Sequence, residues 1–501
     1  MAVAYIGFTS RPAGAPPTFT TGTLPLVGTF LEFTRNPIAL VAKGFESKGP
    51  VYTVNIFGQN LTFLLGAPAH DRFFSTDDRF LSQSEVYKFM TPVFGKGIVY
   101  DAPPKMMSKQ LAFIKNALRG DALHSYVPII VREAEDYFRD HWKDGEVVDL
   151  HESMARLIIL TASSCLMGPE VRGELFEDVA RIFRELDEGI TPLSFFWPTA
   201  PTHAHACRDR ARAELGRIFA KLVRKRRADP DASTTYSDVL QVFVDSKYAD
   251  GSSTTEDQVC GLMVALLFAG QHTSSITTTW LTLLLHHNPS VLVRARAEVD
   301  AAFASADADD VKPTARSGPG ALGFAKVDSM ELMSNCVTET LRMYPPLVLL
   351  MRKVMGNPLR VGKYSVPVGD IVVASPQVSH RLPEGPHQAF TNPGSFDPDR
   401  FNDERAEHRR VPSGFAEMAA AASADGKAPA APAPKNFVGF GGGYHNCRGE
   451  QFARVQAKAI VSVMLRDWII EPQGAMPEAD FAAIVVGPKS GVPVRVRRRT
   501  K

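Results

Sequence analysis

The chain has 501 residues, of which 45% are apolar and 22% charged, so it can bury a large core and is not disordered overall. Its 56 Lys and Arg residues against 54 Asp and Glu give a net charge of +2. Such a balance provides no basic field of the kind that nucleic-acid-binding proteins use, so we expect no nucleic-acid partner. These values indicate a globular, enzyme-sized protein.

The cysteines lie far apart in the chain and form no C-x-x-C pair. This spacing favours a reducing compartment and argues against a disulfide framework or a structural zinc site. The longest apolar stretch, near residues 261–270, is shorter than a membrane span requires, and the opening residues lack the basic start of a secretory signal. We therefore see neither a transmembrane helix nor a signal peptide, and expect either that the protein is unanchored or that an anchor is missing from this sequence. The five cysteines are Cys165, Cys207, Cys260, Cys336 and Cys447.

The predicted elements follow one another without a repeat or an interdomain linker. Residues 51–65 are β-rich, and residues 106–287 have amphipathic helical periodicity. A second β-rich zone covers residues 359–375, and residues 484–498 are typical of a final hairpin. Two low-complexity segments, 305–323 and 419–434, predict surface insertions. The pattern predicts one domain over residues 1–501, mainly α with small β-sheets (α+β).

A long helix is predicted within this region. Thr254 and Asp257 resemble a capping box at its start, and Asn288 precedes a proline at its end. Near its middle, Gly270 weakens the helix and the Thr273 hydroxyl can bond a displaced carbonyl. We therefore expect a local opening of the helix there.

The segment NFVGFGGGYHNCRGEQFA, residues 436–453, is the most informative. Its glycines at 441–443 allow a tight turn and a close approach to a flat ligand. Cys447 lies just ahead of a predicted helix, where free N–H groups favour a thiolate. The segment therefore predicts a soft metal ligand, with a lone buried cysteine beside a glycine loop as the alternative.

Phe440, Gly443, His445, Cys447 and Gly449 together resemble the haem-binding loop of the cytochrome P450 family. The resemblance implies haem b, iron protoporphyrin IX, with the Cys447 thiolate as an iron ligand. It also implies the family's fold, with haem between a long central helix and the cysteine-bearing loop.

An E-x-x-R pair supports the same resemblance. Glu339 and Arg342 share one helix face, and alone they would be read as a surface ion pair. The segment FDPDRF, residues 396–401, resembles the family motif whose arginine completes a buried triad with that pair. The resemblance therefore implies a structural triad of Glu339, Arg342 and Arg400.

Two segments resemble the sterol 14α-demethylases within this family, in particular the protist and plant-like members. They are FAGQHTSS, residues 268–275, which has His272 where most of the superfamily has an acid, and residues 87–101. The resemblance implies removal of a sterol 14α-methyl group in three steps that each consume O₂, with release of formate. Electrons would come from NADPH through NADPH–cytochrome P450 reductase. The implied location is the cytosolic face of the endoplasmic reticulum membrane, with peripheral membrane contact.

The resemblance also assigns roles to individual residues. Thr273 and His272 would be catalytic, and Tyr87, Tyr100, Arg352 and His445 would contact haem propionates. An aromatic residue at position 89 goes with C4-monomethylated substrates such as obtusifoliol, which we therefore expect this chain to prefer. The walls of the substrate site would be apolar, and plain core packing is the alternative for each of them. They are Phe89, Met90, Phe94, Ala265, Phe268, Ala269, Leu347, Leu349 and Val485.

Three further features leave alternatives open. Arg448 stands where the family has an apolar residue, and it could hinder packing below the haem or extend a docking face. The basic run from Arg208 to Arg227 predicts a solvated helix face or a partner surface. The apolar segment 190–198 fits membrane contact or burial. Among functions, another lipid-hydroxylating cytochrome P450, a haem protein that oxygenates nothing, and a structural protein with a decayed site are the alternatives.

Overall fold

The computed structural model describes residues 11–21, 25–56, 58–118, 120–304, 322–413, 434–489 and 491–500. The two predicted insertions lie outside these ranges, apart from residues 322–323 and 434. The chain divides into two compact units of interleaved segments. The sheet unit comprises residues 1–86, 348–394 and 406–445, and the helical unit comprises residues 87–347, 395–405 and 446–501. A single domain over the whole chain stays a prediction.

The sheet unit is built around β-strands with short helices between them. Its elements are α1 (Pro25–Arg35), α2 (Pro37–Lys48), β1 (Val51–Ile56), β2 (Gln59–Leu64), α3 (Ala67–Ser75), β3 (Leu81–Ser82), β5 (Leu350–Val354), β6 (Leu359–Val361), β7 (Tyr364–Val366), β8 (Ile371–Ala374), α18 (Pro376–Ser379), η7 (Glu407–Arg409) and η8 (Gly443–His445). Helix α4 (Ser84–Tyr87) carries the point where the chain passes from this unit to the other.

The main sheet of this unit has the order β1-β2-β8-β5-β3. Strands β1 and β2 are antiparallel, β2 and β8 are parallel with Leu61 opposite Ile371, and β8 and β5 are antiparallel. Their apolar residues pack with Phe73 and Phe74 of α3 in a buried core. Alternating or continuous runs of Val, Ile and Leu favour such strands, and the β-rich predictions for residues 51–65 and 359–375 are confirmed.

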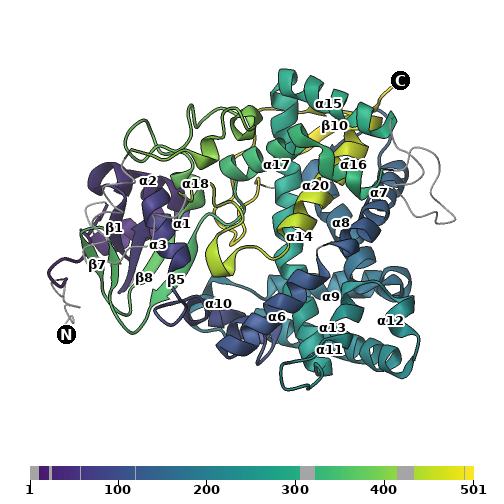
Figure 1. The fold of residues 1–501 in the computed structure, drawn as a ribbon, viewed down its shortest axis with the longest axis horizontal. Helices are drawn as coiled ribbons and strands as arrows, with labels where there is room; N and C mark the ends of the chain where they lie inside the picture. Colours follow the sequence, from purple (N-terminus) through teal and green to yellow (C-terminus); the bar gives the residue numbers. More distant parts are fainter. Residues whose placement is uncertain are drawn as a thin grey trace. The chain divides into compact units, whose positions relative to one another are not determined.

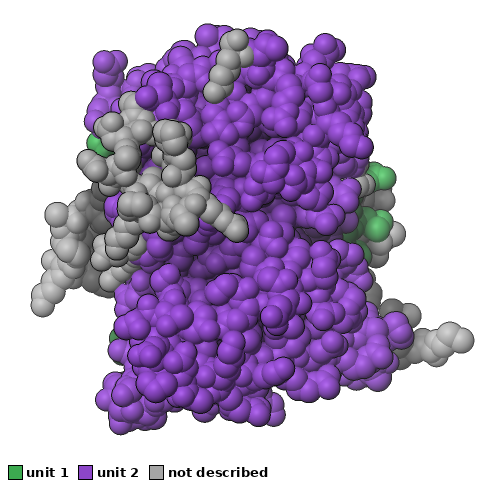
Figure 2. Space-filling view, turned by 90° about the vertical axis from the view of Figure 1, so that its right-hand side faces the viewer, with its two compact units in different colours: residues 1–86, 348–394, 406–445 green, residues 87–347, 395–405, 446–501 purple. Residues whose placement is uncertain are grey.

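The helical unit holds the predicted helices of residues 106–287 and those that follow. Its helices are η1 (Lys88–Met90), α5 (Thr91–Phe94), η2 (Val99–Asp101), α6 (Pro104–Ala117), α7 (Asp121–His141), α8 (Leu150–Ala162), η3 (Ser163–Met167), η4 (Val171–Leu175), α9 (Phe176–Glu188), α10 (Pro192–Phe196), α11 (His203–Ala228), α12 (Ala232–Thr235), α13 (Val239–Asp245), α14 (Glu256–His287), α15 (Pro289–Ala304), α16 (Phe324–Ser329), α17 (Glu331–Met343), η6 (Pro398–Phe401) and α20 (Glu450–Asp467). Figure 2 shows this unit in purple as one packed body.

Helix α14 runs through the helical unit and contacts α8, α11, α17 and α20 (Figure 1). Its capping box is formed by Thr255 and Gln258, one residue later than predicted, because the Thr254 hydroxyl donates to the Phe243 carbonyl instead. The helix is long and apolar enough to cross a membrane, but 67% of its most apolar 18-residue window is buried. It is thus the core helix of this unit, and it ends at Asn288 as predicted.

A three-stranded sheet lies in the same unit, with the order β4 (Val147–Asp149), β10 (Pro493–Arg498) and β9 (Trp468–Pro472). All pairings are antiparallel. The predicted hairpin over residues 484–498 is wrong, because β10 pairs with β4 and β9 rather than with the residues just before it. Residues 484–487 are bends and irregular backbone, and Pro488 forms a single bridge with Ala479.

Candidate functional site

The glycine-rich segment ahead of the cysteine is packed tightly within the sheet unit. Gly441 and Gly443 have positive φ angles of 73° and 64°, a backbone region that favours glycine. A Cβ atom on Gly443 would lie 1.9 Å from the Phe74 carbonyl oxygen, and one on Gly442 would lie 3.1 Å from the Phe74 ring. The predicted tight turn is present, and the close approach that it permits in the protein is to Phe74.

Cys447 is exposed and lies three residues before α20, whose N-cap is Gly449. Although the side chain is accessible, the protein packed around it raises the pKa of its thiol by desolvation. The backbone N–H of Gly449 and the positive charges of Arg448 and Arg454 lower that pKa, and they do not outweigh the desolvation. In the protein alone, desolvation thus opposes the thiolate that the helix start favours, because burial disfavours the charged form of a thiol.

The middle of α14 is accessible although the rest of the helix is buried. Residues 259–267 and 274–285 are buried, whereas residues 268–273 are half-buried or exposed, with Ala269 exposed. A Cβ atom on Gly270 would meet no atom within 4 Å. We call residues 268–273 the α14 window, in which a side chain at position 270 would meet open space.

The Thr273 hydroxyl donates to the Ala269 carbonyl oxygen at 2.6 Å. The helix is nevertheless continuous from Glu256 to His287, so the predicted local opening is not present. The hydroxyl adds a second hydrogen bond at this carbonyl and replaces none. Its oxygen keeps its lone pairs for a further donor.

His272 is paired with Asp187, the penultimate residue of α9. The imidazole Nε2 lies 3.1 Å from the Asp187 carboxylate oxygen, and both side chains are about one-third exposed. Asp187 raises the pKa of His272, and partial burial opposes this shift. Asp187 could not be predicted from the sequence, because nothing in the acidic end of α9 marks one carboxylate as the partner of a histidine far along the chain.

The tyrosines predicted to contact haem stack on each other in the helical unit. The rings of Tyr87 and Tyr100 have centroids 5.2 Å apart, and burial raises the pKa of Tyr100. The Tyr100 ring also packs near the Phe94 ring, and the Tyr87 ring near the Phe89 ring; in each pair the ring centroids are 6.1 Å apart. Tyr100 therefore stays uncharged near neutral pH, as a hydrogen-bond donor to an anionic group must.

Three of the predicted substrate-wall residues belong to one aromatic cluster, in which Tyr87 and Tyr100 link Phe89 to Phe94. Two further phenylalanines, Phe183 and Phe195, also belong to it. The ring centroids of Phe94 and Phe268 are 6.2 Å apart, and those of Phe268 and Phe183 of α9 are 4.8 Å apart. Phe89 contacts Phe195 of α10 at 5.5 Å. Phe183 was not predicted as a wall, and Phe195 was considered only for membrane contact or burial. We call the cluster around Phe94 and Phe268 the aromatic chamber.

The other predicted wall residues differ in exposure. Ala265 is buried, Met90 and Val485 are half-buried, and Leu347 is 43% exposed. The backbone N–H of Val486 donates to the Pro346 carbonyl, which brings the segments that carry Val485 and Leu347 together. Leu349 is half-buried and belongs to the sheet unit.

Glu339, Arg342 and Arg400 meet in the buried interior of the helical unit, and each side chain is fully buried. Glu339 accepts from Arg342 Nε at 2.6 Å, from Arg342 Nη2 at 2.9 Å and from Arg400 Nε at 3.1 Å. The Asp397 backbone N–H adds a bond of 2.9 Å to the same carboxylate. Both guanidinium groups also donate to the Ser395 carbonyl. The pair is thus no surface ion pair, and it anchors the 395–400 segment on α17.

Arg352 and His445 belong to the sheet unit. Arg352 is buried, donates to the Phe73 carbonyl at 2.7 Å and lies over the Phe73 ring. His445 Nε2 lies 2.6 Å from the Asp78 carboxylate. These contacts fix both side chains, and their contact with haem propionates stays a prediction.

The basic run on α11 is not a uniform solvated face. Arg208 and Arg226 are each only 1% exposed, and Arg226 forms a buried ion pair with Asp238 at 2.6 Å. Arg212 is also largely covered. The prediction of a solvated face is therefore wrong for these positions, because the helix packs on α9, α13 and α14. Arg448 donates to the Asn446 side chain at 2.9 Å.

The donor set of the helical unit fits a haem group. Cys447 would hold the haem iron as a soft thiolate ligand, and the α14 window offers space beside Gly270. Gly270 lines the same small pocket as Phe452 near the start of α20, so the window lies beside the helix that follows Cys447. The fold and these groups together define a cysteine-ligated haem protein.

Comparison with known families agrees with this class. The family described as "Cytochrome P450" matches residues 16–493. The chain belongs to the cytochrome P450 family, and it binds haem through a cysteine thiolate and receives electrons from a redox partner.

Relatives with known names are similar over nearly the whole chain. A protein named sterol 14-demethylase from Arabidopsis thaliana is 40% identical over 95% of this chain and 90% of its own length. An obtusifoliol 14-alpha demethylase from Triticum aestivum is 39% identical over 95% of this chain and 97% of its own. A lanosterol 14-alpha demethylase from Mus musculus is 33% identical over 98% of this chain and 89% of its own.

Solved structures share the fold. The retinoic acid-bound cyanobacterial CYP120A1 has a TM-score of 0.77 and 20% identity, with 98% of this chain and 100% of that chain covered. The cytochrome P450DA heme domain also has a TM-score of 0.77, with 18% identity. At these identities the likeness shows the fold alone.

Proposed function

We propose that the protein is a sterol 14α-demethylase. The observation that carries this proposal is 33–40% identity over 95–98% of the chain to relatives named as 14-demethylases from plants and a mammal. The substrate is then a sterol precursor. Three successive oxygenations convert its 14α-methyl group to an alcohol, to an aldehyde and finally to formate, with formation of a 14,15 double bond.

The bound haem supplies the activation of O₂, with Cys447 as the thiolate ligand of its iron. The chain's own residues bind the sterol, exclude water and hold protons. We assign Tyr87, Tyr100, Arg352 and His445 to the haem propionates, since carboxylates beside a buried cofactor need paired donors. Replacement of Cys447 by Ala should abolish both turnover and the thiolate band in the carbon monoxide difference spectrum. Unchanged activity would refute the ligand assignment.

His272 and Thr273 are the proton-handling residues of the α14 window. Asp187 raises the pKa of His272, so the imidazole holds a proton at Nε2 to a higher pH than a free histidine. The Thr273 oxygen can accept a hydrogen bond because its own proton is directed to Ala269. A histidine paired with a carboxylate therefore takes the place of the acid that most of the superfamily has beside the threonine.

The aromatic chamber suits a rigid apolar ligand, whose burial contributes about 25 cal/mol per Å² of apolar surface. The Phe89 ring packs on the Phe195 ring, with their centroids 5.5 Å apart. We propose that it favours sterols with one methyl group at C4, such as obtusifoliol. Replacement of Phe89 by Leu removes ring volume and should raise the turnover of lanosterol relative to obtusifoliol.

The decisive test uses purified, haem-loaded protein. Obtusifoliol and lanosterol are titrated by their spectral shifts, and turnover is then followed by release of formate. We expect tight binding of both sterols, formate release and faster turnover of obtusifoliol. Absence of formate with either sterol would overturn the demethylase proposal, and faster turnover of lanosterol would overturn the preference.

We further propose NADPH–cytochrome P450 reductase as the electron donor and the cytosolic face of the endoplasmic reticulum as the location. Leu193, Phe195 and Trp197 are 42%, 36% and 55% exposed on the segment that contains α10. Exposed aromatic and aliphatic side chains of this kind insert at membrane interfaces. Reconstitution with this reductase, and sedimentation with lipid vesicles, test the two proposals separately.

A further inference from the structure

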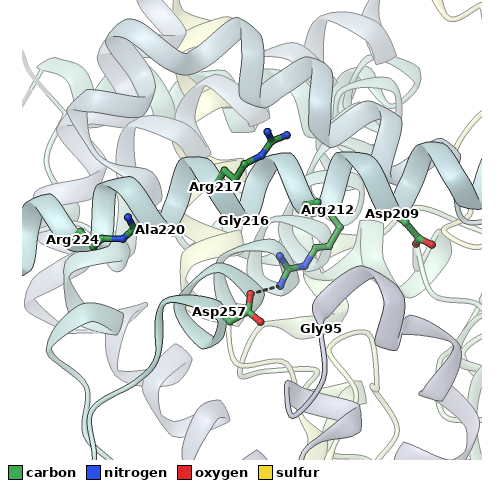
Figure 3. A pocket seen from close by; sticks show the side chains of 9 residues that line it. Gly95, Asp209, Arg212, Gly216, Arg217, Ala220, Arg224 and Asp257 are labelled. Carbon is green, nitrogen blue, oxygen red and sulfur yellow. Dashed lines mark ion pairs between the residues drawn. The ribbon is translucent and has the colours of Figure 1, made fainter.

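An open pocket of about 440 Å³ lies in the helical unit beside α11, the end of α5 and the start of α14 (Figure 3). None of the assigned functional residues lines it. Its lining consists of charged and small residues: Gly95, Asp209, Arg212, Ala213, Gly216, Arg217, Ala220, Arg224 and Asp257.

Acidic groups offset most of the positive charge in this pocket. Arg224 Nε lies 3.0 and 3.1 Å from the two carboxylate oxygens of Glu256. Arg212 lies 3.9 Å from the Asp257 carboxylate, the contact dashed in Figure 3. With these pairs formed, the pocket has little net charge and is no strong anion site. The important feature of the pocket is Arg212, a largely buried residue of its lining.

Arg212 connects three elements of the helical unit. Its guanidinium donates to the carbonyl oxygen of Phe94, the last residue of α5, at 3.2 Å. It also donates to the Cys260 sulfur of α14 at 3.1 Å. Burial raises the pKa of Cys260 to about 11, so the sulfur is a neutral acceptor near neutral pH. The Arg212 side chain is only 12% exposed.

Phe94 stands between this pocket and the aromatic chamber. Its carbonyl is bound by Arg212, while its ring contacts Phe268 and Tyr100 in the chamber. The carbonyl also sits against Gly261 of α14, where a Cβ atom would lie 2.4 Å from it. The position of the Phe94 ring is therefore set by two contacts on its backbone.

We propose that Arg212 is a positioning residue for the substrate: by holding the Phe94 carbonyl against α14, it fixes the Phe94 ring as a wall of the aromatic chamber. This inference rests on the proposed function, because it takes the chamber to be the sterol site. A planar guanidinium can donate to two acceptors at once, which a lysine ammonium does less well at fixed geometry. The open pocket gives small cations in solution access to the same place.

The test compares Arg212→Ala and Arg212→Lys with Arg217→Ala in the full-length, haem-loaded protein. Arg217 is the matched control, because it lies on the same helix and lines the same pocket. It makes no hydrogen bond or ion pair with the other described residues. Obtusifoliol binding is measured by spectral titration, kcat and KM by formate release, and backbone mobility by hydrogen exchange of residues 87–101.

We expect Arg212→Ala to raise KM and the spectral dissociation constant about tenfold, as for loss of a charged hydrogen bond, with a smaller change in kcat. Arg212→Lys should be intermediate and Arg217→Ala unchanged. Added guanidinium ion at low, non-denaturing concentration should partly restore Arg212→Ala and leave the control unaffected. Hydrogen exchange in residues 87–101 should be faster in Arg212→Ala alone.

Equal KM, binding and exchange in Arg212→Ala and Arg217→Ala would overturn the inference, as would a loss confined to kcat. If the wild-type protein neither binds obtusifoliol nor releases formate, the proposed function fails. The exchange comparison then still decides whether Arg212 holds Phe94. If Arg212→Ala loads no haem, Gly261→Ala replaces it, since this change displaces the Phe94 carbonyl and leaves Arg212 in place. It should raise KM in the same way, and an unchanged KM would overturn the inference.

Discussion

Replacing Glu339 by Gln should be among the most destabilising conservative changes in the helical unit. The carboxylate accepts hydrogen bonds from both arginines of the triad and from a backbone N–H, and it is fully buried. The amide keeps the shape but removes the charge, so two guanidinium groups remain buried with their counterion lost. Breaking a buried ion pair in this way costs about 3–5 kcal/mol.

That cost is a large fraction of the 5–15 kcal/mol typical of native proteins. With an m-value of about 3 kcal/mol per molar urea, the unfolding midpoint should fall by ~1–2 M. Urea unfolding followed by circular dichroism, together with the amount of haem bound on expression, measures the effect. Asp399→Asn is the matched control, because Asp399 pairs at 2.7 Å with Arg294 on the surface nearby, where an ion pair contributes about 0–1 kcal/mol. If the two variants unfold at the same urea concentration, the argument from burial is wrong.

Three further predictions follow from pKa shifts and backbone geometry. Asp187→Asn removes the group that raises the pKa of His272, so the alkaline limit of turnover should move to lower pH. The same change should lower the folding stability. The lost contribution is fully present below pH 6.5 and disappears as the pH rises through the raised pKa of His272. Gly443→Ala should destabilise the protein by about 1–3 kcal/mol, since its φ is positive and the new Cβ would meet the Phe74 carbonyl. Burial lowers the pKa of His70 to about 4, so the protein should lose stability as pH falls from 6.5 towards 4.

Each of these predictions has its own control and contrary outcome. A pH–rate profile of Asp187→Asn that superimposes on that of wild type would show that the carboxylate does not act through His272. Gly394→Ala is the control for Gly443→Ala, because a Cβ at Gly394 meets no atom within 4 Å; equal melting temperatures would contradict the steric argument. In His70→Gln, the loss of stability between pH 6.5 and pH 4 should be smaller than in wild type. An unchanged pH dependence would show that this loss does not come from protonation of His70.

The local parts of the fold could be predicted from sequence because they depend on near neighbours. The long helix and the β-rich segments at 51–65 and 359–375 follow from hydrophobic periodicity, and the structure has them in place. The sequence predicts the N-terminus of α14 one residue too early, because Thr254 and Thr255 are both good N-cap residues. Only the bond from Thr254 to Phe243, a contact made by folding, decides between them.

The sequence pattern could not predict which segments or side chains far apart in the chain pair with each other. The strand near the C-terminus has the composition of a hairpin arm, but its partners are β4 and β9. Asp187 carries no motif, since its function depends on reaching His272 from another helix. The contact among Glu339, Arg342 and Arg400 could be predicted from the sequence only because three short motifs resemble those of one family.

The order in which the core of the helical unit is synthesised follows from its topology. Helix α14 is apolar enough to pass for a membrane span, and its neighbours α8 and α11 precede it in the chain. Its neighbours α15, α17, α20 and β9 are made later, and the last of them ends at Pro472. On the ribosome, one side of this helix therefore stays uncovered until almost the whole polypeptide has emerged, and during that interval it is a surface for chaperones or for aggregation.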